Sequence, residues 1–292
     1  MSPRQAWEAE RVSAALTTQP TVRTHPLGLV PAVLVCGAAV LLFGFVLPIA
    51  GYAMLLAGLA VAWLTDRSGR TSRLLPDLFL IALGQAIIST ISLEADISYP
   101  AMVRFAVVLG LAVAVPFLIS RYLYGDRVIR FPWRTGRRWT RIQWLYLIGV
   151  IVAGWLILPF YFITSGVYQN WPTVTAPDEI VRLFIGVNAV GTWDELFFIC
   201  TVFALLRRHF PTWQANLLQT IVFVSFLWEL GYQSWGPLLT IPFALIQGYT
   251  FKLTKSLTYV LVVHLLFDAI VFMVIVYAHN GWPAIFPLVP GG

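Results

Sequence analysis

The residues best able to do chemistry are ionisable side chains that stand inside apolar stretches of the sequence. They are Asp77, Asp194, Glu195, Glu229, His264 and Asp268. A charged group is costly inside a bilayer and is a functional candidate when it occurs there. Acids and an imidazole at such depth could activate water, transfer protons or relay charge.

Asp194 and Glu195 are neighbours near the middle of the apolar stretch 182–206, far from both water layers. Adjacent residues on a helix point about 100° apart, so we expect only one of the two acids to face any single site directly. Two uncompensated charges would be very unfavourable at this depth. A polar partner must therefore face this pair.

The spacing of His264 and Asp268, at positions i and i+4, places both side chains on one face of the last predicted helix. At about 1.5 Å per residue, His264 lies about 12 Å from the cytoplasmic end of its helix and Glu195 about 16 Å from the corresponding end of its own. This matched depth predicts that Glu195, His264 and Asp268 converge around a water-accessible cavity that opens toward the cytoplasm.

The two remaining acids have structural alternatives. Glu229 lies nearer the outer end of its apolar stretch, where it could reach water as an interfacial carboxylate or point inward, toward Glu195. Asp77 follows Pro76 in the first turn of its helix. We expect the Asp77 carboxylate to satisfy free backbone N–H groups and the helix dipole rather than to act in catalysis.

The composition indicates that lipid is the solvent of this chain. Its 292 residues are 59% hydrophobic and 11% charged, with a mean hydropathy of +0.80, whereas a soluble domain carries about 25% charged residues. Since a membrane span needs about 20 mostly apolar residues, we predict an all-α, polytopic transmembrane helical bundle of about eight to nine helices. The second and the eighth of the candidate spans are short. The candidate spans are 27–49, 51–65, 75–93, 101–120, 143–165, 182–206, 214–231, 237–251 and 257–278.

The basic residues set the orientation. With the N-terminus in the cytoplasm, every Lys and Arg except Arg104 and Arg182 falls on the cytoplasmic side. We expect the most basic loop, 121–141, to lie on anionic lipid headgroups, and not to bind nucleic acid, because no soluble domain presents it. The chain then divides into a cytoplasmic tail (1–26), N-terminal transmembrane helices with the basic loop (27–141) and a transmembrane core that carries the site (142–292).

Three stretches of that core resemble motifs of a known family. The stretch 194–199, Asp-Glu-Leu-Phe-Phe-Ile, is similar to a Glu-Glu-x-x-x-Arg motif, and 264–268 is similar to a His-x-x-x-Asn/Asp motif. The glycine, basic turn and Ser-Leu of 248–257 resemble the stretch before that last motif. Over roughly 185–275 the chain therefore resembles the CPBP family of intramembrane proteases, which includes type II CAAX prenyl proteases and Abi bacteriocin-processing or immunity proteins.

The sequence departs from the family's motifs at three positions. Asp194 stands where the family has its first glutamate, and Ile199 stands where it has arginine. The family's second motif, Phe-x-x-x-His, lacks its histidine, and the best-aligned residue is Glu229. Whether catalysis is retained depends on what these three residues do.

The resemblance implies an intramembrane glutamic-type endopeptidase that hydrolyses a membrane-associated or small peptide substrate in the plasma membrane of a prokaryote. Glu195 would activate water, His264 would polarise the carbonyl and Asp268 would orient His264, with Asp194 and Glu229 completing the catalytic set. Glu229 beside Glu195 would share a proton with it, or the two would bind a divalent cation with His264. No cofactor is otherwise expected, and no HExxH spacing supports a metalloprotease.

Two other function classes stay open. A non-catalytic relative could bind a membrane partner or confer immunity, and the missing arginine and histidine favour this alternative. A proton-coupled transporter is the third class, because embedded acids and histidine also form proton relays. The sequence shows no inverted repeat of the kind that many transporters contain.

Overall fold

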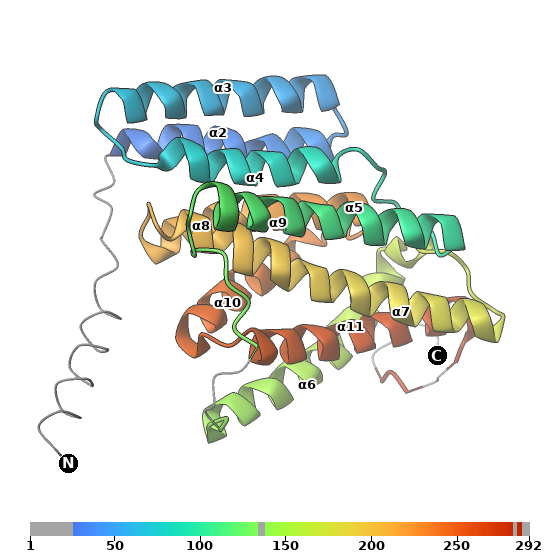
Figure 1. Cartoon of the computed structure of the whole chain (residues 1–292). Coiled ribbons are helices and arrows are strands. Elements are labelled where there is room, and N and C mark those ends of the chain that lie inside the picture. The colour runs from blue at the N-terminus through green and yellow to red at the C-terminus, as the bar shows by residue number, and fades with distance from the viewer. Residues whose placement is uncertain (1–25, 134–137, 283–284, 288–292) are drawn as a thin grey trace, which may run out of the picture.

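The computed structural model describes residues 26–133, 138–282 and 285–287, and all regular secondary structure within them is helical (Figure 1). The predicted all-α fold is confirmed. Within these ranges, six helices are long and apolar enough to cross a membrane. The predicted cytoplasmic tail lies, up to residue 25, outside the described residues.

The N-terminal half contains four helical rods in its described part, from residue 26 onward. In chain order its elements are η1 (Pro26–Gly28), α2 (Leu29–Ala39) continuing as the π-helix η2 (Val40–Gly44), α3 (Pro48–Arg67), α4 (Leu74–Ile88) and α5 (Tyr99–Leu118) continuing as the π-helix η3 (Ile119–Leu123). α2 packs against α3 and α4 along one side of the bundle, and α4 packs against α5 (Figure 1). The second predicted segment is longer than expected, since α3 reaches Arg67, and the third is shorter, since α4 ends at Ile88.

The C-terminal half contains five rods. Its elements are α6 (Arg141–Thr164), η4 (Val167–Asn170), α7 (Pro177–Asp194) continuing as the π-helix η5 (Glu195–Phe203) and then α8 (Ala204–Leu206), α9 (Thr212–Leu230), α10 (Pro237–Thr254) and α11 (Leu257–Asn280). α11 packs against α6 and α7, while α9 packs against η5, α10 and α2. The rod formed by α7, η5 and α8 also packs against α4 and α5 and so joins the two halves.

Local sequence explains where the rods of the C-terminal half begin. Thr140 and Gln143 form a reciprocal capping box at the start of α6. Pro177 occupies the first turn of α7, where its missing N–H costs nothing. Ser256 caps α11 by accepting a hydrogen bond from the Tyr259 N–H. These residues fix the starts of α6, α7 and α11, and α7 and α11 carry residues of the candidate site.

Loops predicted to be cytoplasmic meet at one end of the bundle, here called the inner end. The Asp126 carboxylate forms ion pairs with two arginines: its Oδ2 lies 2.5 Å from Arg208 Nη1 and 3.2 Å from Arg73 Nη2. The Leu257 N–H, at the start of α11, donates to the Pro132 carbonyl at 3.0 Å. Segments far apart in the sequence thus share this end, as the arginine distribution predicts.

The remaining loops meet at the opposite end, here called the outer end. The Asn170 side chain donates to the Gly231 carbonyl at 2.8 Å, and Asn280 donates to the Val174 carbonyl at 2.7 Å. The relative placement of the loops therefore agrees with the predicted alternation of spans. Which end faces the cytoplasm stays a prediction from the arginine distribution.

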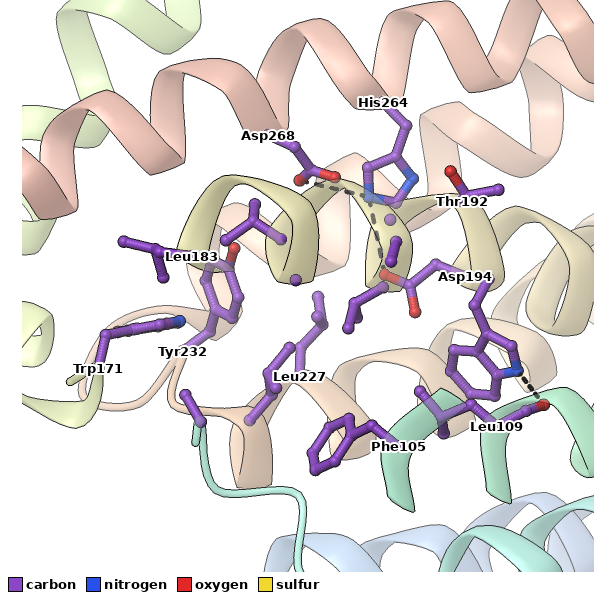
Figure 2. Close-up of a pocket in the computed structure, with 18 of the residues that line it drawn as sticks. Phe105, Leu109, Trp171, Leu183, Thr192, Asp194, Leu227, Tyr232, His264 and Asp268 are labelled. Carbon is purple, nitrogen blue, oxygen red and sulfur yellow. Dashed lines mark hydrogen bonds and ion pairs between the residues drawn. The ribbon is translucent and has the colours of Figure 1, made fainter. Parts of the chain in front are cut away.

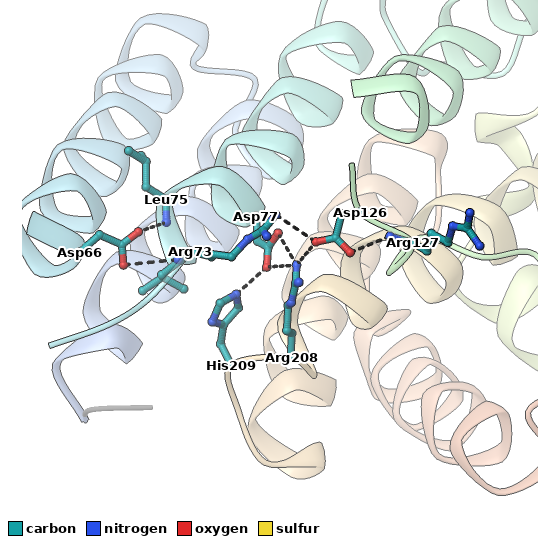
Figure 3. A network of polar contacts seen from close by, with 9 residues as sticks. Asp66, Arg73, Leu75, Asp77, Asp126, Arg127, Arg208 and His209 are labelled. Carbon is teal, nitrogen blue, oxygen red and sulfur yellow. Dashed lines mark hydrogen bonds and ion pairs between the residues drawn. The ribbon is translucent and has the colours of Figure 1, made fainter. Parts of the chain in front are cut away.

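Asp77 has a different structural role from the one expected (Figure 3). Its carboxylate contacts His209 Nε2 at 2.6 Å and Arg208 Nη1 at 3.2 Å. The free N–H groups at the start of α4 are instead satisfied by Asp66, which accepts hydrogen bonds from Leu74 and Leu75. Asp77 thus anchors the inner end of the α7–η5–α8 rod to α4, and we call this contact the inner anchor.

Candidate active site

Glu195 lies where α7 changes into the π-helix η5. A π-helix bonds i to i+5, is rare, and is frequent at functional sites. The Thr201 hydroxyl donates to the Leu196 carbonyl, five residues earlier, at 2.9 Å. The acid pair therefore lies at a local change of helical pitch, and both acids are at least 97% buried, with 3% exposure for Asp194 and 1% for Glu195.

Both acids face the imidazole of His264. Glu195 Oε1 lies 2.7 Å from His264 Nδ1, and Asp194 Oδ2 lies 3.7 Å from His264 Nε2. The expectation that only one acid would face a single site directly is wrong, because the imidazole presents a different ring nitrogen to each carboxylate. His264 is thus the polar partner that the pair requires.

Asp268 completes the cluster from the next turn of α11. Its Oδ1 lies 3.8 Å from His264 Nε2, the distance that an i, i+4 pair on one helix allows (Figure 2). The structure therefore brings Asp194, Glu195 and Asp268 together around His264. We call these four residues the acid–histidine cluster.

Gly191 permits the close approach of Asp268 to α7. A Cβ atom at Gly191 would collide with Oδ2 of Asp268 and would lie 3.3 Å from Cδ2 of His264. Only glycine lets the α11 side chains approach the α7 backbone this closely. Gly191 therefore belongs to the local architecture of the cluster, although it carries no functional group.

Gln247 is a site residue that the sequence reasoning missed. Its side chain on α10 is 1% exposed, and its Nε2 donates to Glu195 Oε1 at 2.7 Å and to the Val260 carbonyl at 2.9 Å. Glu195 is thus held by donors from two different helices. A neutral amide inside an apolar stretch was the available signal, but such amides are common interhelical contacts and do not by themselves indicate catalysis.

Glu229 does not join the cluster. Its Oε1 accepts a hydrogen bond from the Leu93 N–H at 3.0 Å, and the side chain lines a separate cavity at the outer end. The prediction that it points toward Glu195 is therefore wrong. The α9 residues that line the cavity of the cluster are Leu227 and Leu230, which lie four residues after Phe223 and Phe226, so α9 presents leucine to this cavity and no histidine (Figure 2).

The proposed metal ligands are not assembled either. Glu229 lines a different cavity from His264, so the set of Glu195, Glu229 and His264 does not converge. Across the described residues, no three His, Cys, Asp or Glu side chains are placed to hold a metal ion. Ile199, at the family's arginine position, is buried and uncharged, so it supplies no cation to the acids.

A cavity of about 400 Å³ leads away from the cluster (Figure 2). His264, Asp268 and Asp194 line one end of it, Tyr232 lines the wall near these carboxylates, and Asp96 and Trp171 line the other end. These last residues belong to the loops of the outer end. The prediction that the cavity opens toward the cytoplasm is therefore wrong in the predicted topology, since the cavity extends to the opposite end of the bundle.

Several polar atoms of the cluster have no protein partner. Glu195 Oε2, Asp194 Oδ1 and Asp268 Oδ2 are buried and accept no hydrogen bond within the described chain. Buried polar atoms are almost always paired with protein or ordered water. No protein group therefore occupies these three oxygens, and two of them, on Asp194 and Asp268, belong to residues that line the cavity.

Tyr232, in the loop 231–236 between α9 and α10, adds a hydroxyl to the cavity wall. Burial raises the pKa of the Tyr232 phenol well above its usual range, and the nearby carboxylates of Asp268 and Asp194 raise it further. The phenol therefore stays neutral at physiological pH and remains a hydrogen-bond donor. The sequence reasoning gave this tyrosine no role because it lies outside the apolar stretches.

Comparison with known families supports a protease. Residues 176–270 match the model of the Rce1-like type II CAAX prenyl endopeptidases. No curated protein and no solved structure gives a significant match. The matched range runs from the start of α7 into α11 and contains the whole acid–histidine cluster. The predicted resemblance to the CPBP proteases is thus confirmed, and with six helices able to span a membrane the chain is an integral membrane protein.

Proposed function

We propose that this membrane protein, whose residues 176–270 match the Rce1-like CAAX proteases, is an endopeptidase in which Glu195 activates water. The observation that carries the proposal is the set of contacts to Glu195. His264 Nδ1 and Gln247 Nε2 each lie 2.7 Å from Oε1, whereas Oε2 has no protein partner. One oxygen is thus held in place, and no protein group competes with a water molecule for the other, which lies beside the cavity-lining residues Asp194 and His264.

In the proposed reaction, Glu195 removes a proton from the water as its oxygen attacks a peptide carbonyl carbon. The positive imidazolium of His264 stabilises the negative charge that develops on the carbonyl oxygen. Collapse of the tetrahedral intermediate breaks the C–N bond, and Glu195 returns the proton to the leaving amine. Asp268, which lies 3.8 Å from His264 Nε2, orients the ring in this scheme.

The charges of the cluster favour shared protons. One imidazolium can compensate only one of the three carboxylates of Asp194, Glu195 and Asp268, and like charges this close cannot all ionise in a buried site. We therefore propose that Asp194 and Asp268 retain a proton between them. A protonated carboxyl group can donate a hydrogen bond, so it could take the place of the family's missing histidine in holding the water.

A second candidate function is partner binding, in which the protein is non-catalytic and binds another membrane protein. The observations in its favour are Ile199, which is buried and uncharged at the family's arginine position, and α9, which presents Leu227 and Leu230 to the cavity and no histidine. In that case the acid–histidine cluster would serve packing alone. The proton-coupled transporter gains no such support from the structure.

The test uses Glu195→Gln with Glu229→Gln as its matched control. Both changes replace a carboxylate by an amide of similar volume, but only Glu195 contacts His264. With a membrane-anchored fluorogenic peptide library in proteoliposomes, Glu195→Gln should lower kcat/KM by about 10²- to 10⁴-fold, the usual contribution of a general base. Glu229→Gln should cleave at nearly the wild-type rate. Full activity in both variants would reject Glu195 as the general base, and an absence of cleavage by the wild-type protein would favour partner binding.

The proposal also concerns the location of the protein, its partners and its need for a metal. We propose that the protein resides in the plasma membrane of a prokaryote and acts on a peptide or membrane-protein substrate. The basic loop 121–141 would lie on anionic lipid headgroups. Catalysis by Glu195 requires no metal in this scheme, so cleavage should persist in the presence of a chelator.

A further inference from the structure

The cavity of the cluster occupies the half of the bundle nearer the outer end. On α5 its lining runs from Met102 to Gly110, and on α7 it includes Leu183 and Asp194. On α9 and α10 its lining residues all lie near the outer ends of the helices, and no residue of the inner loops lines it. The deep end of the cavity is therefore the cluster, and its mouth lies toward the outer loops.

The way from the cluster to the inner end is closed. The residues that follow Glu195 along η5 toward that end, from Phe197 to Phe203, are each at most 2% exposed. Phe198 packs against Phe223 of α9 with ring centroids 4.6 Å apart. Buried aromatic and aliphatic side chains thus separate the cluster from the basic loops.

The cavity is open to the sides of α5 and α7 that face the membrane. Ala106 and Gly110 of α5 line the cavity and are exposed on the surface of the bundle. Ile185 and Ala189 of α7 also line it and are exposed. Since lipid covers this surface of a membrane-spanning bundle, a ligand can reach the cluster from the bilayer without first crossing an aqueous face.

The lining of the cavity restricts the chemistry of the ligand. No Lys or Arg lines it within the described residues, whereas Asp96 lies at its mouth and Asp194, His264 and Asp268 line its deep end, with Glu195 directly behind His264. The other lining residues are mainly aliphatic and aromatic, so an extended apolar segment fits them. A free terminal carboxylate would meet acids and find no cationic partner other than His264.

We propose that the substrate is an uncharged, apolar internal segment of a membrane-inserted peptide that enters laterally between α5 and α7 from the outer half of the bilayer. The inference rests on the proposed function for its chemistry and on the cavity for its route. The scissile bond would then lie at the depth of Glu195, below the outer surface. Peptides delivered in water to the inner face would not reach the cluster.

Two glycines at the opening allow a direct test of the route. A Cβ at Gly110 or at Gly186 would meet no other atom within 4 Å, so a tryptophan at either position should project into open space without disrupting the packing. Gly149, on the exposed side of α6, has the same free space but does not line the cavity. Gly149→Trp is therefore the matched control for Gly110→Trp and Gly186→Trp.

The first experiment measures cleavage of a single-span reporter peptide in proteoliposomes. We expect Gly186→Trp and Gly110→Trp to lower the initial rate at least about tenfold by blocking entry, and Gly149→Trp to leave it unchanged. Equal rates in all three variants would overturn the lateral route. A short water-soluble reporter that is cleaved as fast as the spanning one would overturn the substrate class.

The second experiment does not require activity. In a chain whose only native cysteines, Cys36 and Cys200, are replaced by alanine, Val190→Cys places a thiol on the cavity wall. A membrane-impermeant maleimide should label it only from the face opposite to the one that labels an Arg130→Cys reference in the basic loop. Labelling of both cysteines from the same face would overturn the inference. If labelling is as expected but wild-type protein cleaves nothing, the proposed function fails while the access route stands.

Discussion

Gln247→Leu tests whether the amide on α10 positions the catalytic carboxylate. The change keeps a side chain of similar size but removes both hydrogen bonds of Nε2, the one to Glu195 and the one to the Val260 carbonyl. Interhelical hydrogen bonds in membrane bundles contribute about 0.6 kcal/mol on average and at most about 1.7 kcal/mol each. The loss of folding free energy should therefore be about 1–3 kcal/mol.

The effect on catalysis should be larger than this loss of stability implies. Without Gln247, the Glu195 carboxylate keeps only its contact with His264 and can rotate away from the water that it activates. Since a displacement of roughly 1 Å can cost about a hundredfold in rate, kcat should fall by about 10- to 100-fold while KM changes little.

Gln219→Leu is the matched control, because Gln219 on α9 is equally buried and donates to Asn216, Thr220 and the Ala244 carbonyl, none of which belongs to the cluster. Thermal unfolding in detergent and steady-state cleavage of the same peptide should be measured for both variants. We expect similar losses of Tm and a loss of kcat in Gln247→Leu alone. If kcat falls equally in both variants, or in neither, Gln247 does not position the base.

Further predictions concern the inner anchor, the helix contact at the site and the topology. Asp77→Asn should lower the free energy of unfolding by about 2–3 kcal/mol, measured by urea or thermal unfolding. This is less than the full penalty of breaking a buried ion pair, because Arg208 keeps Asp126 as a second carboxylate partner. Activity per folded molecule should persist. Gly191→Ala should lower cleavage at least about tenfold and reduce Tm, because its methyl group overlaps the Asp268 carboxylate; a fully active variant would refute this account of the contact. A cysteine at position 130 should react with an impermeant maleimide only from the cytoplasm, and one at position 282 only from outside.

Much of the fold could be predicted because it depends on local and compositional signals. Apolar length predicts spans, and the distribution of Lys and Arg predicts which loops share an end. The i, i+4 spacing of His264 and Asp268 placed them on one face without any tertiary information. The embedded acids Asp194 and Glu195 required a partner at their own depth, and His264 lies at that depth.

Other features depend on tertiary contacts that the sequence does not reveal. The π-helical turn after Glu195 is set by packing against α5, α9, α10 and α11, so the directions of the two acids could not be read from ideal α-helical angles. Glu229 lies within two positions of Leu227 and Leu230, and only the orientation of α9 shows that these two leucines line the cavity of the cluster and Glu229 does not. The amide of Gln247 resembles ordinary interhelical contacts until its partner is known.

The number of residues in the π-helix η5 determines how the site and the inner anchor are oriented relative to each other. Deleting any one residue from Phe197–Phe203 would leave Glu195 beside His264 but change the rotation and the rise of the chain beyond the deletion, carrying Arg208 away from Asp77. Substitutions within this segment could preserve that phase relation, whereas a deletion could not. The number of residues between Glu195 and Arg208 is therefore a structural requirement of its own, whichever side chains occupy the segment.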